Sequence, residues 1–237
     1  MALISELSVF LPTYNEGGII KKVVLHTKEV LADVAERWEL LVVNDGSIDN
    51  TGDVVENLAK EDRRIRLINH DVNRGYGASL KTGFYNAKFS WIAFADSDGQ
   101  FDFGEIKNFI KAQKETGADL VIGYYRARQV SLSKKITSKM WEYLVFLFFG
   151  LKVKDVDCGF KFVSRKVIKA IPKLESERGA FISSELLIKA KKSGFKIVEI
   201  PVTHYPRARG SGTGRKLNVI IKSFLDLFKL WKKLRLG

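Results

Sequence analysis

A single cysteine, Cys158, occurs in the 237 residues, which excludes an internal disulfide framework. We interpret it as a small buried side chain rather than a reactive thiol. Only four prolines are present, and there is no Ser/Gly-rich or low-complexity tract, so we expect no long disordered linker. No internal repeat is visible at solenoid periods. With 46% hydrophobic residues, the chain is expected to form one large domain, or two small ones, with a proper core.

Long apolar runs are also missing. No run reaches the ~18 residues of a membrane span, and the longest candidate, 140–151, contains Glu142. The first ten residues lack a basic region followed by an apolar core, so no signal peptide is predicted. We therefore expect a cytoplasmic chain, peripheral on the cytoplasmic face of a membrane. The net charge of +13 fits nucleic acid, an anionic membrane surface or phosphorylated substrates.

The first half alternates strand and helix patterns. The predicted strands are 7–11, 40–43, 65–68, 91–95 and 119–123. The predicted helices are 16–36, 50–60, 77–88 and 103–115. This alternation predicts an α/β fold with a mostly parallel central sheet flanked by helices. The second half is less regular, with helices predicted over 134–149, 183–193 and 215–235 and strand patterns over 155–163 and 196–204.

Three polar clusters follow predicted strands, at 14–16, 44–47 and 96–100. Ligands of parallel sheets bind beyond the carboxyl ends of the strands, so we expect the clusters to meet at one edge. Asp96 and Asp98 can both face one ligand there. A hard divalent ion such as Mg2+ or Mn2+ takes oxygen ligands, and it would stabilise the charge on a departing nucleotide diphosphate. The alternative is a plain Asp-Gly turn, but the neighbouring clusters favour the site.

Five segments carry a family resemblance: LPTYNE at 11–16, NDGS at 44–47, NRGYG at 73–77, DSDGQ at 96–100 and DCGFK at 157–161. In this order they resemble the inverting family 2 glycosyltransferases of GT-A fold. Within that family the sequence is most similar to the polyprenyl-phosphate sugar transferases, such as dolichyl-phosphate mannose or glucose synthases. The resemblance runs from about Ser8 to Gly212. It implies a single Rossmann-like GT-A domain over 1–212, a nucleotide-sugar donor and Mg2+ or Mn2+.

The resemblance also implies residue roles. Nucleotide-sugar binding falls on Pro12, Tyr14, Glu16, Asp45, Asp96 and Ser97, with Asp45 at the base. Metal binding falls on Asp96, Asp98 and Gln100. The catalytic residues would be Asp96, Asp98 and Asp157. Asp157 would orient the acceptor or act as a weak base, and a hairpin-stabilising carboxylate is the alternative. Asn44 stands where the family usually has aspartate, and we expect it still to cap its loop.

A phosphate acceptor is already anionic near neutral pH, so transfer to it needs no strong general base. It needs cations, and arginine suits phosphate through its planar fork. The candidates for acceptor phosphate binding are Arg126, Arg128, Lys139, Arg207, Arg209 and Ser211. The segment 207–212 resembles the family loop that closes over the phosphates. For any one arginine, a solvated surface charge is the alternative.

Two helices suggest a membrane surface. The predicted helix at 140–151 is apolar nearly all round, which favours an interfacial helix that meets the acceptor's lipid tail over a core helix. The segment 213–237 is basic and amphipathic, as suits an anionic bilayer, although it could instead dock on the domain. We therefore expect peripheral attachment.

Two other functions stay open at this point. One is transfer to a soluble or cell-surface glycan. The other is a nucleic-acid-binding module, against which the acidic turn argues because carboxylates repel phosphate unless a metal intervenes. Nothing in the sequence separates GDP-mannose from a UDP-sugar as donor.

Overall fold

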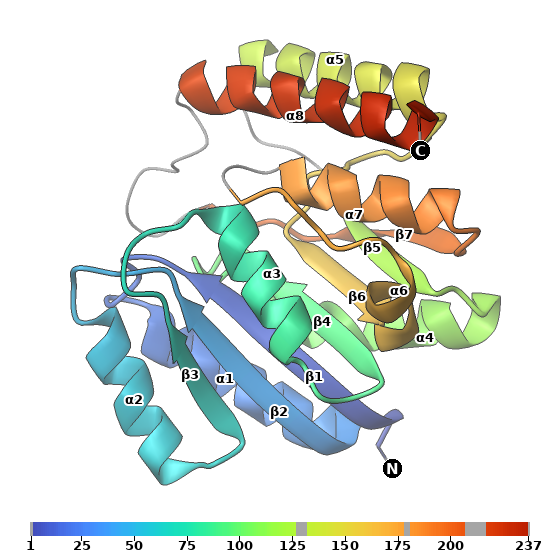
Figure 1. The fold of residues 1–237 in the computed structure, drawn as a ribbon. Helices are drawn as coiled ribbons and strands as arrows, with labels where there is room; N and C mark the ends of the chain where they lie inside the picture. The colour runs from blue at the N-terminus through green and yellow to red at the C-terminus, as the bar shows by residue number, and fades with distance from the viewer. Residues whose placement is uncertain (1, 127–131, 178–180, 207–216, 237) are drawn as a thin grey trace.

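The computed structural model describes residues 2–126, 132–177, 181–206 and 217–236. A seven-stranded sheet lies at the centre, in the order β3-β2-β1-β4-β6-β5-β7. Neighbouring strands are parallel except β6, which is antiparallel to both β4 and β5. Helices cover both faces, and α5 and α8 form an outer layer beyond α7 (Figure 1). The predicted α/β fold with a mostly parallel sheet is confirmed.

The strands are β1 (Ile4–Thr13), β2 (Ala35–Asn44), β3 (Ile65–Asn69), β4 (Trp91–Ala95), β5 (Leu120–Tyr125), β6 (Phe160–Ser164) and β7 (Ile197–Val202). The helices are α1 (Ile20–Val34), α2 (Thr51–Glu61), α3 (Tyr76–Asn86), the 3-10 turn η1 (Phe103–Glu105), α4 (Ile106–Thr116), α5 (Leu132–Phe149), α6 (Arg165–Ala170), α7 (Phe181–Lys192) and α8 (Leu217–Leu236). Every element predicted for the first half is present, with shifted bounds. The helix α6 was not predicted.

The largest shift lies between α1 and β2. The predicted helix 16–36 begins only at Ile20, because the amides of residues 15–17 donate to side chains of the loop after β2 and of the first residue of α2. It ends at Val34, and β2 starts directly at Ala35. There the chain pairs with the start of β1, from Ile4 opposite Ala35 onward. Pairing with a neighbouring strand thus overrides the helical spacing of this segment, which sequence periodicity cannot register.

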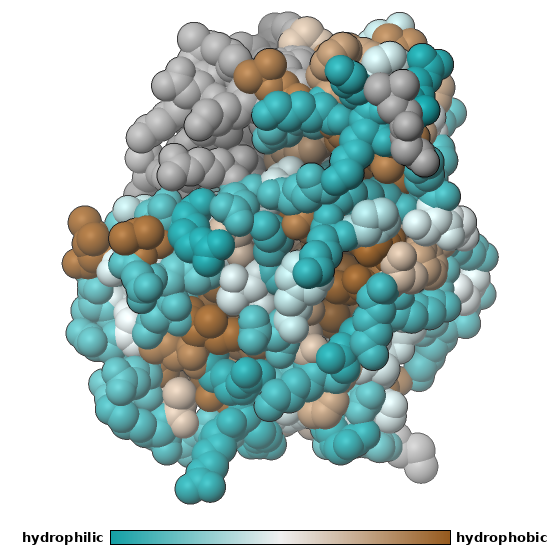
Figure 2. Space-filling model, in the orientation of Figure 1, coloured by the Kyte–Doolittle hydropathy of each residue, from teal (hydrophilic) through white to brown (hydrophobic). Residues whose placement is uncertain are grey.

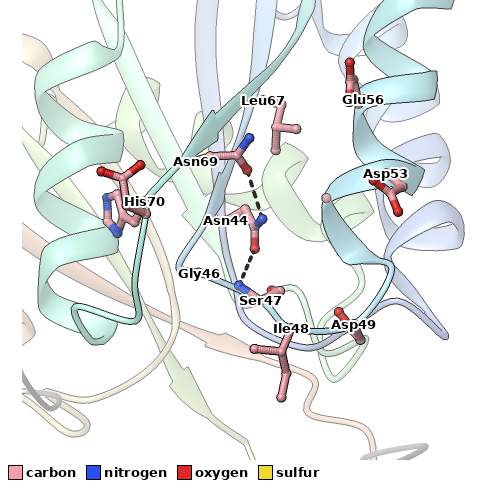
Figure 3. Close-up of a pocket in the computed structure, with 12 residues that line it drawn as sticks. Asn44, Gly46, Ser47, Ile48, Asp49, Asp53, Glu56, Leu67, Asn69 and His70 are labelled. Carbon is pink, nitrogen blue, oxygen red and sulfur yellow. Dashed lines mark hydrogen bonds between the residues drawn. The ribbon is translucent and has the colours of Figure 1, made fainter.

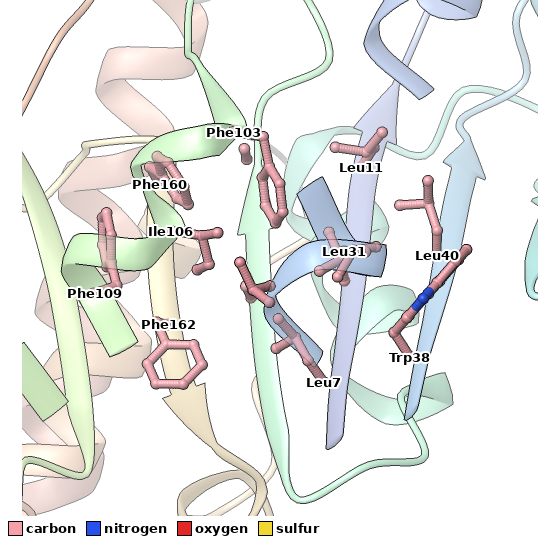
Figure 4. Close-up of a cluster of buried hydrophobic side chains, with 14 of the residues drawn as sticks. Leu7, Leu11, Leu31, Trp38, Leu40, Phe103, Ile106, Phe109, Phe160 and Phe162 are labelled. Carbon is pink, nitrogen blue, oxygen red and sulfur yellow. The ribbon is translucent and has the colours of Figure 1, made fainter. Parts of the chain in front are cut away.

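The core consists of two apolar clusters, one on each face of the sheet. Figure 4 shows the cluster under α1 and α4, where Phe160 of β6 stacks on Phe103 and Phe109 with ring centroids 5.6 and 4.4 Å apart. On the other face Phe10 and Phe94 stack at 5.2 Å. Buried on both sides, the strands form a rigid platform, and the polar segments at their carboxyl ends are held by it.

The outer layer is packed on the domain through one side only. Leu227 and Leu230 of α8 are buried, and Trp231 meets Phe148 of α5 edge-on at 5.6 Å. Trp141 of α5 donates its indole N–H to Ser184 of α7 at 3.1 Å. The C-terminal helix therefore docks on the domain, and the segment 140–151 belongs partly to the core. Within the described ranges, no helix is long and apolar enough to span a bilayer.

Candidate active site

The three predicted polar clusters do meet. They follow β1, β2 and β4, which are adjacent in the sheet order β2-β1-β4, and all three strands are parallel. Their carboxyl ends therefore share one edge. Segments that lie some eighty residues apart in the chain form one site there, as the strand pattern predicted.

The loops after β1 and β2 are tied together by hydrogen bonds. The Asn15 amide donates to Ser47 Oγ, and the Ile48 amide donates to Asn15 Oδ1, both at 2.9 Å. Asn15 adopts a left-handed backbone with φ of 55°, which its short polar side chain tolerates. Beside these loops Tyr14 is 37% exposed, so its ring is available to a ligand.

Asn44 caps its loop as expected. Its Oδ1 accepts from the Ser47 amide at 3.2 Å, and its Nδ2 donates to Asn69 Oδ1 at 2.9 Å (Figure 3). Since the amide fills both roles, asparagine can replace the usual aspartate without opening the loop.

Asp45 is buried, and its two oxygens hold the next loop. They accept from the backbone amides of Arg74 at 2.9 Å and Gly75 at 2.7 Å, and Oδ1 lies 2.6 Å from His70 Nδ1. The other ring nitrogen of His70 is 2.9 Å from the hydroxyl of Thr82. Asp45 thus positions the glycine-rich loop, and its predicted contact with a base stays a prediction. Sequence reasoning missed His70, which carries no local signal.

The acidic turn is anchored at both ends. The buried hydroxyl of Ser97 donates to the Pro12 carbonyl at 2.8 Å. Gln100 donates its side-chain amide to the Tyr205 carbonyl at 2.9 Å, and its backbone amide donates to Asp98 Oδ1 at 3.1 Å. Ser97 therefore ties the turn to β1, while its predicted contact with the donor is untested.

Asp96 is set in place by two other segments. The hydroxyl of Tyr76 donates to Asp96 Oδ1 at 2.8 Å. Burial, and then the nearby Asp96 carboxylate, raise the pKa of Tyr76 well above its ordinary value, so the phenol stays protonated and donates. Across the carboxylate lies Gly159, where an added Cβ would stand 2.1 Å from Asp96 Oδ2. A side chain at 159 and the observed Asp96 rotamer exclude each other.

A buried lysine lies below this turn. Lys161 is fully buried in β6, and its ammonium donates to the Cys158 carbonyl and lies 3.5 Å from Ser183 Oγ. Burial lowers the pKa of Lys161, whereas the neighbouring Cys158 and the acids Asp157, Asp155 and Asp96 act in the opposite direction. Asp157 is half-buried, and its carboxylate interacts electrostatically with the ammonium of Lys161. Whether it orients an acceptor or acts as a base is not tested. Cys158 is buried, as predicted.

The donor atoms at the turn suit a hard divalent ion. Asp96, Asp98 and Gln100 offer carboxylate and amide oxygens within five residues, which is the ligand type that Mg2+ and Mn2+ take. In the described part of the chain, no three His, Cys, Asp or Glu side chains group into a complete metal site. The oxygens of the turn fit Mg2+ or Mn2+ by ligand type, and the ion itself stays a prediction.

Two hollows open on this edge. One, of about 360 Å3, lies beside the Asn44–Ser47 loop (Figure 3). Its described lining includes Asp49, Asp53, Glu56 and Asp71 but no lysine or arginine, whereas the lining of the second includes Lys22. The second, of about 310 Å3, is bounded by Asp96, Gly99, Phe101 and Tyr205 among others. We assign the chemistry to the second because it contains the acidic turn.

Two of the six residues predicted to bind the acceptor phosphate, Arg126 and Lys139, lie among the described residues. Arg126 is exposed at the end of β5, at the carboxyl edge of the sheet. Lys139 is exposed on α5 and pairs with Glu142 of the same helix at 2.6 Å. The remaining candidates, Arg128, Arg207, Arg209 and Ser211, lie outside the described residues.

A family model, Glycosyl transferase family 2, matches residues 8–171, about two thirds of the chain. The chain belongs to this family. It is 32% identical over 238 residues to a dolichyl-phosphate beta-glucosyltransferase of Trichomonas vaginalis, ALG5A, with 94% of this chain and 72% of the relative covered. It is 29% identical to a dodecaprenyl-phosphate galacturonate synthase of Rhizobium johnstonii, with 98% and 69% covered.

Among solved structures, glucosyl-3-phosphoglycerate synthase of Mycobacterium tuberculosis, in complex with Mn2+, UDP and its product, matches with a TM-score of 0.67. The identity is 20%, with 94% of this chain and 80% of that chain covered, so the likeness shows the GT-A fold. The chain spans 33%, 72% and 66% of the lengths of three curated relatives. The relatives from Trichomonas vaginalis and Rhizobium johnstonii are named as a glucosyltransferase and a galacturonate synthase, not as mannosyltransferases.

Proposed function

We propose that this glycosyltransferase moves a hexose or hexuronate from a nucleotide-sugar to a polyprenyl phosphate, with inversion at the anomeric carbon. The observation that carries the proposal is the acidic turn 96–100, fixed at the meeting point of three loops beside a hollow of about 310 Å3. The names of the relatives support the class of acceptor, since they act on dolichyl or dodecaprenyl phosphate.

In this proposal an acceptor phosphate oxygen attacks the anomeric carbon while the bond from that carbon to the donor diphosphate breaks. The nucleoside diphosphate leaves with the electron pair, and no proton needs to be removed. Tyr14 and the loops after β1 and β2 hold the base and ribose. Asp96, fixed by Tyr76 and Gly159, binds the donor at the reacting end, and Arg126 meets the acceptor phosphate.

Mg2+ or Mn2+, when bound by Asp96, Asp98 and Gln100, would neutralise charge on the departing diphosphate. The turn holds two carboxylates, Asp96 and Asp98, which would otherwise repel that group. The requirement follows from charge: two acidic side chains and a diphosphate cannot share one edge without a cation.

We further propose that the outer layer rests on an anionic membrane. Large apolar side chains of α5 and α8 stay 48–61% exposed: Met140, Tyr143, Phe146, Leu147, Leu225 and Phe228. Exposed cations lie among them, namely Lys139, Lys229, Lys232 and Arg235. Figure 2 shows apolar and hydrophilic atoms side by side over this layer, at the top of the view. Such a surface suits the headgroup region of a bilayer.

The test is a panel of radiolabelled GDP- and UDP-sugars with a short polyprenyl phosphate, with and without Mn2+. We expect a chloroform-soluble labelled product that disappears with a chelator and in Asp98→Ala. Activity that survives the chelator would refute the metal. Transfer to free saccharides but not to the lipid phosphate would show that the acceptor is a glycan. Tight, salt-sensitive nucleic-acid binding that persists in Asp98→Ala would refute the proposed function and favour a nucleic-acid-binding module.

A further inference from the structure

A short strap, residues 173–177, runs from the end of α6 toward α7 and lies against the first turn of α3. Its contacts with α3 are close. The Glu177 carbonyl accepts from the Ala78 amide at 2.9 Å, and a methyl group added to Gly77 would stand 2.7 Å from the Ser176 carbonyl oxygen. The strap therefore cannot shift without displacing the N-terminus of α3.

The strap provides a cap that α3 lacks in its own sequence. The helix begins after Gly75, which has no side chain to accept from the free amides of the first turn. The Glu177 carbonyl accepts from one of them instead. The Glu177 carboxylate adds ionic contacts to Lys81 at 2.9 Å and to Arg74 at 3.4 Å. The strap thus touches both the glycine-rich loop and the helix that follows it.

A buried ion pair on α7 holds the strap from behind. Glu185, 1% exposed, accepts from the backbone amides of Glu175 at 2.8 Å and Ser176 at 2.9 Å. Lys189, one turn along, donates to Glu185 Oε1 at 2.5 Å and to the Lys173 carbonyl at 2.6 Å. Removing two charges from water is costly, and here the cost is offset by the three hydrogen bonds that the pair makes to backbone groups of the strap. The pair therefore fixes the strap on α7.

The path from this pair ends at the acidic turn. Glu185 fixes the strap, the strap fixes the α3 N-terminus, and Tyr76 is the first residue of that helix. The hydroxyl of Tyr76 in turn holds Asp96. On the opposite side the same N-terminus is held by Asp45 through the amides of Arg74 and Gly75. The glycine-rich loop is therefore held directly by Asp45 on one side and by Glu185, through the strap, on the other.

We infer that Glu185 is a positioning residue for the donor: with Lys189 it holds the strap 173–177, and the strap holds the loop 73–77 and Tyr76 at the donor site. This inference rests on the proposed function, because it assumes that a nucleotide-sugar binds there. Glu185 touches no reacting atom, so its replacement should weaken donor binding rather than slow the bond-making step itself.

The test compares Glu185→Gln with the double variant Glu185→Gln/Lys189→Met. The double variant removes the uncompensated buried ammonium that could unfold the single one. Lys192→Met is the matched control, because Lys192 lies on the same helix but donates to the Leu234 carbonyl of α8. Three readouts are needed: amide hydrogen exchange of residues 73–77 without ligand, binding of UDP and GDP with Mn2+ by calorimetry, and KM for donor and acceptor.

We expect exchange at 73–77 to accelerate about tenfold in both Glu185 variants and donor KM to rise about tenfold, with acceptor KM unchanged. Lys192→Met should match the wild type. A folded double variant with wild-type exchange at 73–77 overturns the inference, whatever the donor proves to be. So does a loss of kcat with an unchanged donor KM, since a general loss of structure lowers the active fraction. Wild-type protein that binds neither nucleotide refutes the proposed function, and the inference with it.

Discussion

Replacing Gly159 by alanine should remove activity while leaving the fold in place. The new Cβ would stand 2.1 Å from Oδ2 and 2.5 Å from Cγ of Asp96, distances that real Cβ atoms do not show. Gly159 is not among the described residues with positive φ, so its backbone accepts alanine. The side chain of Asp96 must therefore move by about 1 Å or more, away from the hydroxyl of Tyr76.

A displacement of about 1 Å at a positioning group can lower the rate about 100-fold, which corresponds to about 2.7 kcal/mol of transition-state stabilisation. We expect kcat/KM for sugar transfer to fall by this factor, measured with a nucleotide-sugar and a short polyprenyl phosphate. Thermal unfolding followed by circular dichroism should show little change.

Gly117→Ala is the matched control. Gly117 ends α4 with φ of 64° and has open space where a Cβ would be added. Alanine there costs about 1 kcal/mol of stability through backbone strain but should leave kcat/KM unchanged. The reasoning is refuted if Gly159→Ala keeps wild-type kcat/KM, or if its loss of activity only follows a matching loss of folded protein.

Four further outcomes can be measured. Tyr76→Phe should lower kcat/KM at least tenfold because Asp96 loses the hydroxyl that holds it, and it should lower the free energy of unfolding by about 1.5–3 kcal/mol while the protein stays folded. Phe160→Ala should reduce the free energy of unfolding in urea by about 3–5 kcal/mol. Burial raises the pKa of Cys158 to about 12, so native protein should resist iodoacetamide at pH 8 and react only when unfolded. The Arg64 guanidinium holds the pKa of Asp62 far below its ordinary range. This pair therefore stabilises the fold above about pH 4, and its contribution is lost as pH falls through the lowered pKa. Asp62→Asn should lower the free energy of unfolding by about 1 kcal/mol at pH 7, and the difference from wild type should disappear in acid.

The sequence predicts the parallel half of the sheet well because each strand there is a short apolar run between polar turns. The same regularity places the acidic turn 96–100 and the loops at 14–16 and 44–47 on one edge. Sequence periodicity fails where pairing with a neighbouring strand decides whether a segment becomes helix or strand. Residues 35 and 36 lie in the predicted helix but form the start of β2 because β1 lies beside them. The antiparallel β6 falls within the strand pattern predicted over 155–163, but that pattern does not give its direction, which is seen only in its pairing with β4 and β5.

The contacts that fix Asp96 show why the rest of the site escapes sequence reasoning. Its holders are Tyr76, twenty residues before it, and Gly159, sixty-three residues after it, and neither carries a signal of contact with an acid. Glu185 acts on the same site through two further contacts. Tyr76 and Gly159 lie within the segments 73–77 and 157–161 that carry the resemblance, but only packing between distant segments brings them against Asp96. Substitutions at 76, 159 and 185 are therefore expected to share one result, a lower kcat/KM for the donor in a folded protein, although they lie on different elements.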